Sequence, residues 1–192
     1  MTIADASVSG HIAPSVFEEM IPSVTAEIDR LLPDIVISMG EFGGRGLLTV
    51  ERLAQNYIDA KRYGIADEAG VQPQETIVPG GPAAYYATLP IRAMVKAMRA
   101  AGVPADISDT AGTFGCNLLM YGVLHHISVN NLPIRAGWVH LPSIPATAAL
   151  EENIGMPSMS IETQIAGLRA GIAAAVGHEG DISDPVKSNW QF

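Results

Sequence analysis

The sequence predicts an α/β fold: a mostly parallel open sheet with helices on both faces, forming a three-layer α/β/α sandwich. Two observations predict it. Short β-branched apolar runs alternate along the chain with amphipathic helical segments, and the connections between them are mostly short. The 192 residues are 48% hydrophobic and only 16% charged, which supplies enough apolar material for one substantial core.

The first part of the chain predicts one helix and two strand regions. Residues 15–32 repeat apolar side chains at helical spacing; Pro22 indicates that the regular helix starts near that residue, and Pro33 ends it. The run DIVISMG is short, β-branched and stopped by glycine, which is typical of a buried strand. LLTVERLAQNYID then predicts another strand, with Glu51 inside it.

The second part begins with a long irregular stretch, residues 64–84, rich in Gly, Pro and acidic side chains. A loop of this length in a compact domain is more often functional than idle. LPIRAMVKAMRAAG predicts an amphipathic helix that ends at Gly102, and PADIS predicts a short strand after it.

Three elements complete the predicted fold. CNLLMYGVLHHI predicts a helix that begins at Cys116, and IRAGWVHLP predicts a strand that ends near His140. PSMSIETQIAGLRAGIAAAVG predicts the last helix, with Ser158 or Ser160 near its N-cap. The chain contains no repeat and no long linker, so we expect one domain over residues 1–192, with residues 1–12 and 178–192 loosely held.

Charge and composition exclude several classes of partner. A net charge of −9 argues against nucleic acid and anionic membranes, because both attract clustered Lys and Arg. No apolar run approaches the roughly 20 residues of a membrane span, and the N-terminal residues lack the basic and apolar regions of a secretory signal. The single cysteine fits a reducing compartment, so we expect a cytoplasmic protein.

Cys116 is a candidate nucleophile. It follows a Gly-containing turn and opens a helix, where the helix dipole and unpaired backbone N–H groups favour the thiolate and lower the pKa of the thiol. The same N–H groups could hold an oxyanion. The alternative is that Cys116 is a small buried apolar side chain, as free cysteines usually are. The residues alone leave both interpretations open.

A cysteine nucleophile needs a base, and five histidines are available. His11 and His178 lie in the expected loose ends. His125 and His126 lie in the helix begun by Cys116, two to three turns away, and point about 100° apart, so they make a weak metal pair. His140 remains as the base, with a core histidine bonded to the backbone as the alternative.

The acid that would orient the base is Glu51. It stands inside the apolar run TVERLA, where a carboxylate is costly unless it has a partner. The alternative is a salt bridge from Glu51 to Arg52 or Arg45. Acids in the long loop, at positions 67, 68 and 75, are expected to be solvated. The Gly-rich loops match no phosphate-binding pattern, so we expect no nucleotide.

Several segments together resemble the pyroglutamyl peptidase I family, also called the pyrrolidone-carboxylate peptidases. TAGTFGCN followed by LMYGVLHH is similar to that family's cysteine motif, and GEFGGRGLLTVERLAQN to its glutamate motif. GPAAYYATLPIRAM, RAGWVHLPSIP and PSMSIET are similar to three further family segments. The resemblance covers roughly residues 14–176, and the order of the motifs makes it specific.

The resemblance implies a cytosolic cysteine omega-peptidase that removes an N-terminal pyroglutamyl (5-oxoprolyl) residue from peptides, with no cofactor and no metal. It implies Cys116 as nucleophile, His140 as general base and acid, and Glu51 as the group that orients His140. It also implies Arg92 near the oxyanion and Gln72 near the lactam of the substrate. The fold implied is an α/β/α sandwich, and the assembly a homo-oligomer, usually a tetramer.

The chain departs from the family pattern at two places. Family members begin with a strand and a TGFxPFGG-type loop whose aromatic residues help to form the pyroglutamate pocket, and MTIADASVSG does not match it. Gly115 stands where the family usually has a larger aliphatic residue, which removes one pocket wall. We therefore also consider a catalytically impaired member that acts as a binding or assembly protein, and an amidase or thioesterase for another small acyl group.

Overall fold

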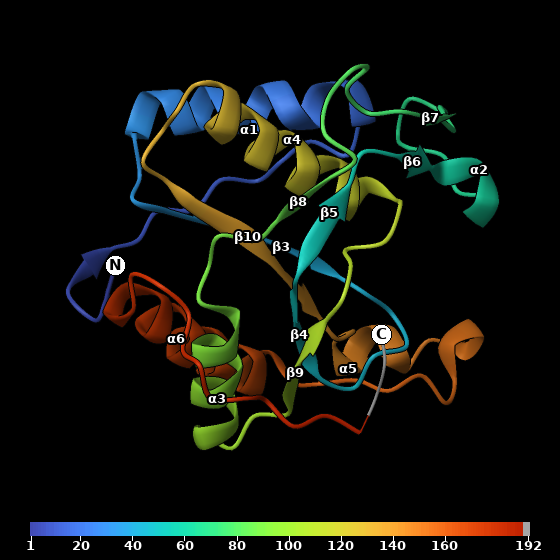
Figure 1. Cartoon of the computed structure of the whole chain (residues 1–192). Coiled ribbons are helices and arrows are strands. Elements are labelled where there is room, and N and C mark those ends of the chain that lie inside the picture. Colours follow the sequence, from blue (N-terminus) through green and yellow to red (C-terminus); the bar gives the residue numbers. More distant parts are fainter. Residues whose placement is uncertain (190–192) are drawn as a thin grey trace.

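The computed structural model describes residues 1–189 and confirms the predicted α/β sandwich. A four-stranded sheet lies between helices α1 and α4 on one face and helices α3 and α6 on the other (Figure 1). The helices of these two layers are α1 (Phe17–Leu31), α3 (Ile91–Ala100), α4 (Gly115–Val129) and α6 (Ile161–Gly177). The strands of the sheet are β3 (Ile35–Glu41), β4 (Leu48–Glu51), β9 (Ala105–Ser108) and β10 (Arg135–Leu141).

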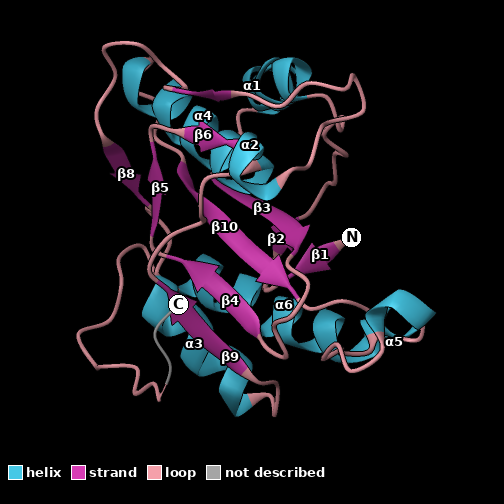
Figure 2. Cartoon of the chain, turned by 90° about the vertical axis from the view of Figure 1, so that its right-hand side faces the viewer, coloured by secondary structure: helices cyan, strands magenta, loops and turns pink. Residues whose placement is uncertain are grey.

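The sheet has the strand order β3-β10-β4-β9 and is mostly parallel (Figure 2). β10 pairs with β3 in parallel along seven residues, and β4 pairs with β9 in parallel along four. The central pair, β10 with β4, is antiparallel and short, with Val139 opposite Val50 and His140 opposite Thr49. The expected mostly parallel sheet is confirmed, with this one antiparallel junction at its centre.

Two hydrophobic cores lie on opposite faces of the sheet because side chains alternate along each strand. On β10, Ala136 and Trp138 belong to the core under α1 and α4, and Val139 belongs to the core under α3 and α6. The predicted apolar stripe of residues 89–102 is confirmed, since its large side chains are buried in this second core. A third, smaller cluster around Phe17 and Leu118 lies where α1 meets α4.

Small elements complete the structure, and the sequence pattern did not predict most of them. The region 47–59 is broken into three short strands rather than one, because the chain leaves the main sheet after Glu51. β5 then pairs with β8, and β6 with β7. The small elements are β1 (Thr2–Ile3), β2 (Ala6–Ser7), β5 (Leu53–Gln55), β6 (Ile58–Asp59), α2 (Ala60–Tyr63), β7 (Gln74–Glu75), β8 (Ala84–Tyr86), α5 (Pro145–Ala148) and a 3₁₀ turn (Glu151–Asn153).

Helix α1 begins five residues before the position expected from Pro22, which lies inside the helix. Proline costs a helix the hydrogen bond that its missing N–H would donate. Phe17 and Ile28 are both buried, so the apolar face of the helix offsets that loss. At the other end of the chain, Ser160 is the N-cap of α6 and accepts a hydrogen bond from Thr163 N, as one of the two expected caps.

The segment after α6 packs along helix α3. Asp181 accepts hydrogen bonds from the backbone N–H groups of Arg92 and Ala93 at the start of that helix. Asp184 pairs with Lys96 at 3.1 Å. The sequence predicts a loosely held end over residues 178–192, of which the last three lie outside the described residues. Within the described residues, no helix is long and apolar enough to cross a membrane.

Candidate active site

His140 and Glu51 are brought together by the central antiparallel pair of the sheet. Thr49 lies opposite His140, and Glu51, two residues further along β4, points to the same face. His140 Nδ1 lies 2.7 Å from Glu51 Oε1, and both side chains are almost completely buried. A carboxylate only accepts, so Nδ1 donates and the other ring nitrogen, Nε2, faces away from the carboxylate. Within residues 1–189, Nε2 has no hydrogen-bond partner.

Cys116 is the second residue of α4, which begins one residue before the predicted start, and its sulfur lies against the same face of the sheet. Gly40 on β3 lies opposite His140 in the parallel pair. A Cβ atom at Gly40 would lie 3.4 Å from Cys116 Sγ and only 2.8 Å from Cζ2 of Trp138. The absence of a side chain at position 40 therefore lets the sulfur and the indole ring approach the strand. Within residues 1–189, no hydrogen bond joins Cys116 to His140, and His140 Nε2 is buried without a hydrogen-bond partner.

The pKa of the Cys116 thiol is raised, whereas the sequence predicts a lowered one. Burial, with a smaller contribution from the negative charge of Glu51, raises its pKa to about 12. The backbone N–H of Cys116 and the charge of Arg45 act in the opposite direction and are weaker. The helix N-terminus is thus present, but desolvation outweighs it. A pKa raised in this way favours the neutral thiol at neutral pH.

Glu51 also has a cationic partner, and the sequence alternative of a salt bridge to Arg45 is part of the same site. Arg45 Nη1 donates to Glu51 Oε1 at 3.0 Å and to Thr49 Oγ1 at 2.6 Å. Arg52, the other alternative, pairs instead with Asp109. Glu51 is fully buried, and the guanidinium and the imidazole both contact its Oε1, which offsets part of the cost of burying the charge; within residues 1–189, Oε2 has no hydrogen-bond partner. The sequence signal for this contact is the arginine of GEFGGRG.

Helix α4 is fixed beside the site by a residue that the sequence reasoning missed. The Asn117 side chain accepts from the backbone N–H of Gln55 and donates to the carbonyl oxygens of Gln55 and Tyr57. These bonds tie the first turn of α4 to the strand that follows Glu51. Among residues 1–189, no side chain caps this helix at Phe114, so backbone N–H groups in its first turn stay available to an anion.

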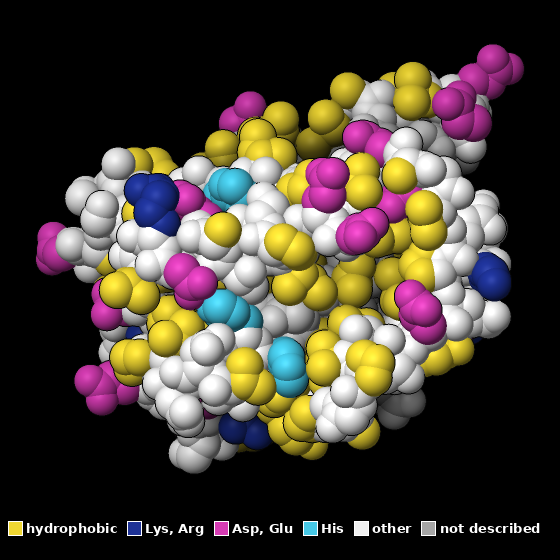
Figure 3. All heavy atoms as spheres, turned by 90° about the horizontal axis from the view of Figure 1, so that it is seen from above, with side chains coloured by type: hydrophobic (Ala, Val, Ile, Leu, Met, Phe, Trp, Pro, Cys, Tyr) yellow, Lys and Arg dark blue, Asp and Glu magenta, His cyan; other side chains and the backbone are white. Residues whose placement is uncertain are grey.

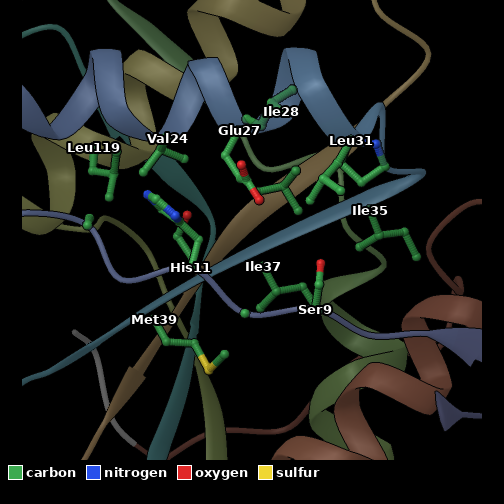
Figure 4. Close-up of a pocket in the computed structure, with 15 residues that line it drawn as sticks. Ser9, His11, Val24, Glu27, Ile28, Leu31, Ile35, Ile37, Met39 and Leu119 are labelled. Carbon is green, nitrogen blue, oxygen red and sulfur yellow. The ribbon is translucent and has the colours of Figure 1, made fainter. Parts of the chain in front are cut away.

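A cavity of about 530 Å³ opens beside Cys116. Its walls are the stretch before α1 and its first turn, the loop 65–68, the end of β3 and the first turn of α4, with Trp138 from β10. A separate hollow lies along the edge of β3, and His11, Glu27 and Met39 are among the residues that line it (Figure 4). Cys116 does not line that hollow, so it is not the candidate site.

Two predicted site residues are not near Cys116. Arg92 is on α3, on the opposite face of the sheet from α4, and is held by Asp181 at 3.5 Å. Gln72 is exposed in the long loop and does not line the cavity beside Cys116. The expectations that Arg92 lies at the oxyanion and Gln72 at the lactam do not agree with this structure. Arg92 is excluded because its helix packs on the other side of the sheet, and Gln72 because its side chain is exposed to solvent.

The remaining titratable candidates have structural partners. His125 lies 3.0 Å from the Tyr85 hydroxyl, and His126 lies 2.8 Å from Asp29 on α1. Asp67 was expected to be solvated, but its carboxylate accepts backbone N–H groups from Phe17, Ala69 and Val71. Within the described part of the chain, no three His, Cys, Asp or Glu side chains are grouped as metal ligands.

Comparison with protein families gives a match to the model described as pyroglutamyl peptidase, over residues 1–178. A pyrrolidone-carboxylate peptidase from Mycobacterium marinum is 58% identical over 192 residues, which is 100% of this chain and 86% of that protein. One from Cupriavidus necator is 46% identical over 184 residues, or 95% of this chain and 83% of that protein.

Solved structures give the same result. The pyrrolidone carboxyl peptidase from Thermococcus litoralis superposes with a TM-score of 0.90 at 34% identity, covering 97% of this chain and 87% of that one. The pyroglutamyl peptidase I from Bacillus amyloliquefaciens superposes with a TM-score of 0.84 at 39% identity, covering 90% of this chain and 80% of that one.

Proposed function

The chain belongs to the pyroglutamyl peptidase family, and from this premise we propose that Cys116, His140 and Glu51 carry out its reaction. It is a cysteine peptidase with pyrrolidone-carboxylate peptidase activity, and its substrates are pyroglutamyl peptides. The observation that carries the residue assignment is the 2.7 Å contact of His140 Nδ1 with Glu51, which leaves Nε2 without a partner on the face where Cys116 lies.

The first half of the reaction forms a thioester. As the Cys116 sulfur bonds to the acyl carbon of the pyroglutamyl residue, its proton passes to His140 Nε2, and the carbonyl oxygen becomes an oxyanion. The N–H groups of the first turn of α4, at Gly115 and Cys116, support that charge. The imidazolium then gives its proton to the leaving amine as the carbon–nitrogen bond breaks.

The second half releases the product. His140 takes a proton from water as the water oxygen attacks the thioester, and the proton returns to the departing Cys116 sulfur. Free 5-oxoproline leaves with the water oxygen. Glu51 keeps Nε2 directed at the reacting atoms by holding Nδ1–H, and its charge stabilises the imidazolium in both halves. A thiol pKa of about 12 favours general-base transfer on substrate binding over a preformed thiolate.

The test is fluorophore release from a pyroglutamyl aminomethylcoumarin, with Cys116→Ser as the inactive control. We expect release by the wild type and a loss of at least about 10³-fold in Cys116→Ser. Glu51→Gln is expected to lower kcat by about 10²- to 10⁴-fold, with a smaller change in KM, because the imidazole loses its orienting charge. Cys116→Ser protein that retains wild-type turnover would contradict the assignment of the nucleophile.

We propose in addition that residues 1–192 act as one domain in a cytoplasmic homo-oligomer that binds neither nucleic acid nor a membrane surface. The net charge of −9 supports the last two parts. The face formed by α1 and α4 supports them too, because acidic side chains outnumber basic ones on it (Figure 3). A filter-binding assay with DNA and co-sedimentation with anionic vesicles are expected to give no binding at physiological salt.

A further inference from the structure

The cavity beside Cys116 has an aromatic wall that comes from helix α1. Phe17 is nearly buried, and its ring meets the ring of Phe114 edge-to-face, with centroids 5.3 Å apart. Phe114 in turn meets Tyr63 at 5.7 Å. Phe17, Phe114 and Cys116 all line the same cavity. An aromatic surface therefore stands next to the sulfur, where an acyl group would bind.

Gly115 and Phe17 are complementary in shape. A Cβ atom at Gly115 would lie 3.2 Å from Cε1 of Phe17 and 3.5 Å from Cε of Met20. The first distance is tighter than ordinary van der Waals contact, so any side chain at position 115 would press on the ring. The ring thus fills the space that the glycine, immediately before Cys116, leaves open.

The position of Phe17 is fixed from the other side by the loop 65–71. The backbone N–H of Phe17 donates to Asp67 Oδ2 at 2.9 Å, and the same carboxylate accepts from Val71 and Ala69. Glu68 N donates to Ser15 O at 3.2 Å, immediately before the helix. These bonds anchor the backbone at Phe17, and the edge-to-face contact with Phe114 supports the ring, so the wall is formed before any substrate arrives.

We propose that Phe17, in the space provided by Gly115, sets the size of the lactam ring that the enzyme accepts. This inference rests on the proposed function of Cys116. The five-membered lactam of a pyroglutamyl residue is compact, and its two ring methylenes would pack on the aromatic ring while the acyl carbon meets the sulfur. A six-membered lactam carries one more methylene and would collide with the same ring.

The test compares two coumarin amides, one of the five-membered lactam and one of its six-membered homologue, 6-oxopiperidine-2-carboxylate. One methylene in an apolar site typically changes kcat/KM by about 10-fold or more. We expect Phe17→Ala to shift the ratio of kcat/KM values toward the larger ring by at least that factor, chiefly through KM. Phe17→Leu is the second variant, with a smaller shift in the same direction and less risk to folding.

The coupling of the two positions is tested separately. Gly115→Ala is expected to lower kcat/KM for the five-membered substrate, and Phe17→Leu in the same chain is expected to recover part of that loss. Gly177→Ala, at a helical glycine with open space around it, is the matched control and is expected to leave the ratio unchanged. An unchanged ratio in folded Phe17→Ala and Phe17→Leu, or strictly additive effects at 17 and 115, would overturn the inference. Absence of release by the wild type would instead overturn the proposed function.

Discussion

The pKa of the Cys116 thiol is determined by two opposing features of one position. The first turn of α4 favours the thiolate, and burial beside Glu51 disfavours it. The sequence shows the helix start, because a Gly-containing turn precedes the cysteine, but it does not show how deeply the sulfur is buried. The location of Cys116 could be predicted, whereas the sign of its pKa shift could not.

The upward shift of the Cys116 pKa predicts how this residue reacts with iodoacetamide. At pH 7.5 we expect alkylation of the native enzyme to be slower by about 10²-fold or more than that of a free cysteine, because the thiolate fraction is much smaller when the pKa is about 12. The rate should rise about tenfold per pH unit up to pH 10. The chain has a single cysteine, so mass spectrometry measures this site alone.

The control is the same protein unfolded in guanidinium chloride, in which Cys116 should react at the rate of a free thiol. A plateau in the alkylation rate of the native enzyme between pH 6 and pH 9 would show a preformed thiolate–imidazolium pair. That result would contradict a neutral thiol in the free enzyme.

At the scale of elements, the pairing of His140 with Glu51 depends on a register that the sequence does not contain. Hydrophobic pattern predicted strands containing both residues, and alternation predicted buried faces. Only the antiparallel junction between β10 and β4 puts the two side chains on one face. The break after Glu51 was missed for a similar reason, because β5 is stabilised by pairing with β8, 30 residues away in the chain, rather than by its local pattern.

Asn117 is the main polar link between α4 and the segment after Glu51, and its removal should be costly. We expect Asn117→Ala to lose three hydrogen bonds at about 1 kcal/mol each and to lower the unfolding free energy by about 2–4 kcal/mol. For a chain of this size that corresponds to a fall in Tm of about 5–15 °C, measured by circular dichroism.

Asn130→Ala, at the C-terminal end of the same helix, is the matched control, because its side-chain bonds are exposed. We expect a change of Tm of less than about 3 °C there. Equal changes in the two variants would show that the Asn117 bonds do not anchor the helix.

Asp67 links the long loop to helix α1, and its contribution should depend on pH. Backbone N–H groups, first that of Phe17 and then that of Val71, lower the pKa of this carboxyl below its usual 3.8. A group whose pKa is lower in the folded state stabilises the protein above its unfolded pKa, and this contribution is lost as the pH falls through the folded value. Asp67→Asn should therefore lower the Tm at pH 7.

The Tm difference between wild type and Asp67→Asn should narrow as the pH falls below about 4, and differential scanning fluorimetry from pH 7 to pH 3 measures it. Asp109→Asn is the control, because Asp109 pairs with the side chain of Arg52 at an exposed site. A Tm difference that is constant across the range would exclude the backbone-bonded carboxylate as its source.

At the scale of the whole molecule, composition and alternation of elements were sufficient to predict the layers of the sandwich. They were insufficient to place the side chains that line the cavity beside Cys116, which come from five separate segments of the chain. Arg92 shows why: a basic residue in a segment that resembles the family lies on the wrong face of the sheet from Cys116. Whether a side chain reaches the site depends on which face its helix packs against, and this is determined by the tertiary structure.

The free edge of the sheet predicts that copies of this chain assemble into an oligomer. β3 is a terminal strand of seven mostly apolar residues, and in the described part of the chain no strand pairs with its outer edge. Hollows of about 280 Å³ and 390 Å³ flank it, and Met39 within the strand and Leu32, three residues before it, are exposed. Such an edge is a template for pairing with another chain. We expect light scattering to give a mass that is a multiple of the 20.2 kDa chain.

The apolar surface beside β3 is tested by Leu32→Asn, because Leu32 lines one of the flanking hollows and asparagine tolerates the left-handed backbone of this position, with φ of 46°. If copies meet along β3, this variant should dissociate at a concentration about tenfold higher than the wild type does. Leu150→Asn, at an exposed leucine outside the strand and its flanking hollows, should not. A wild-type mass of 20.2 kDa at 50 μM would contradict the homo-oligomer, since an edge of this length would then be stable in water without a partner.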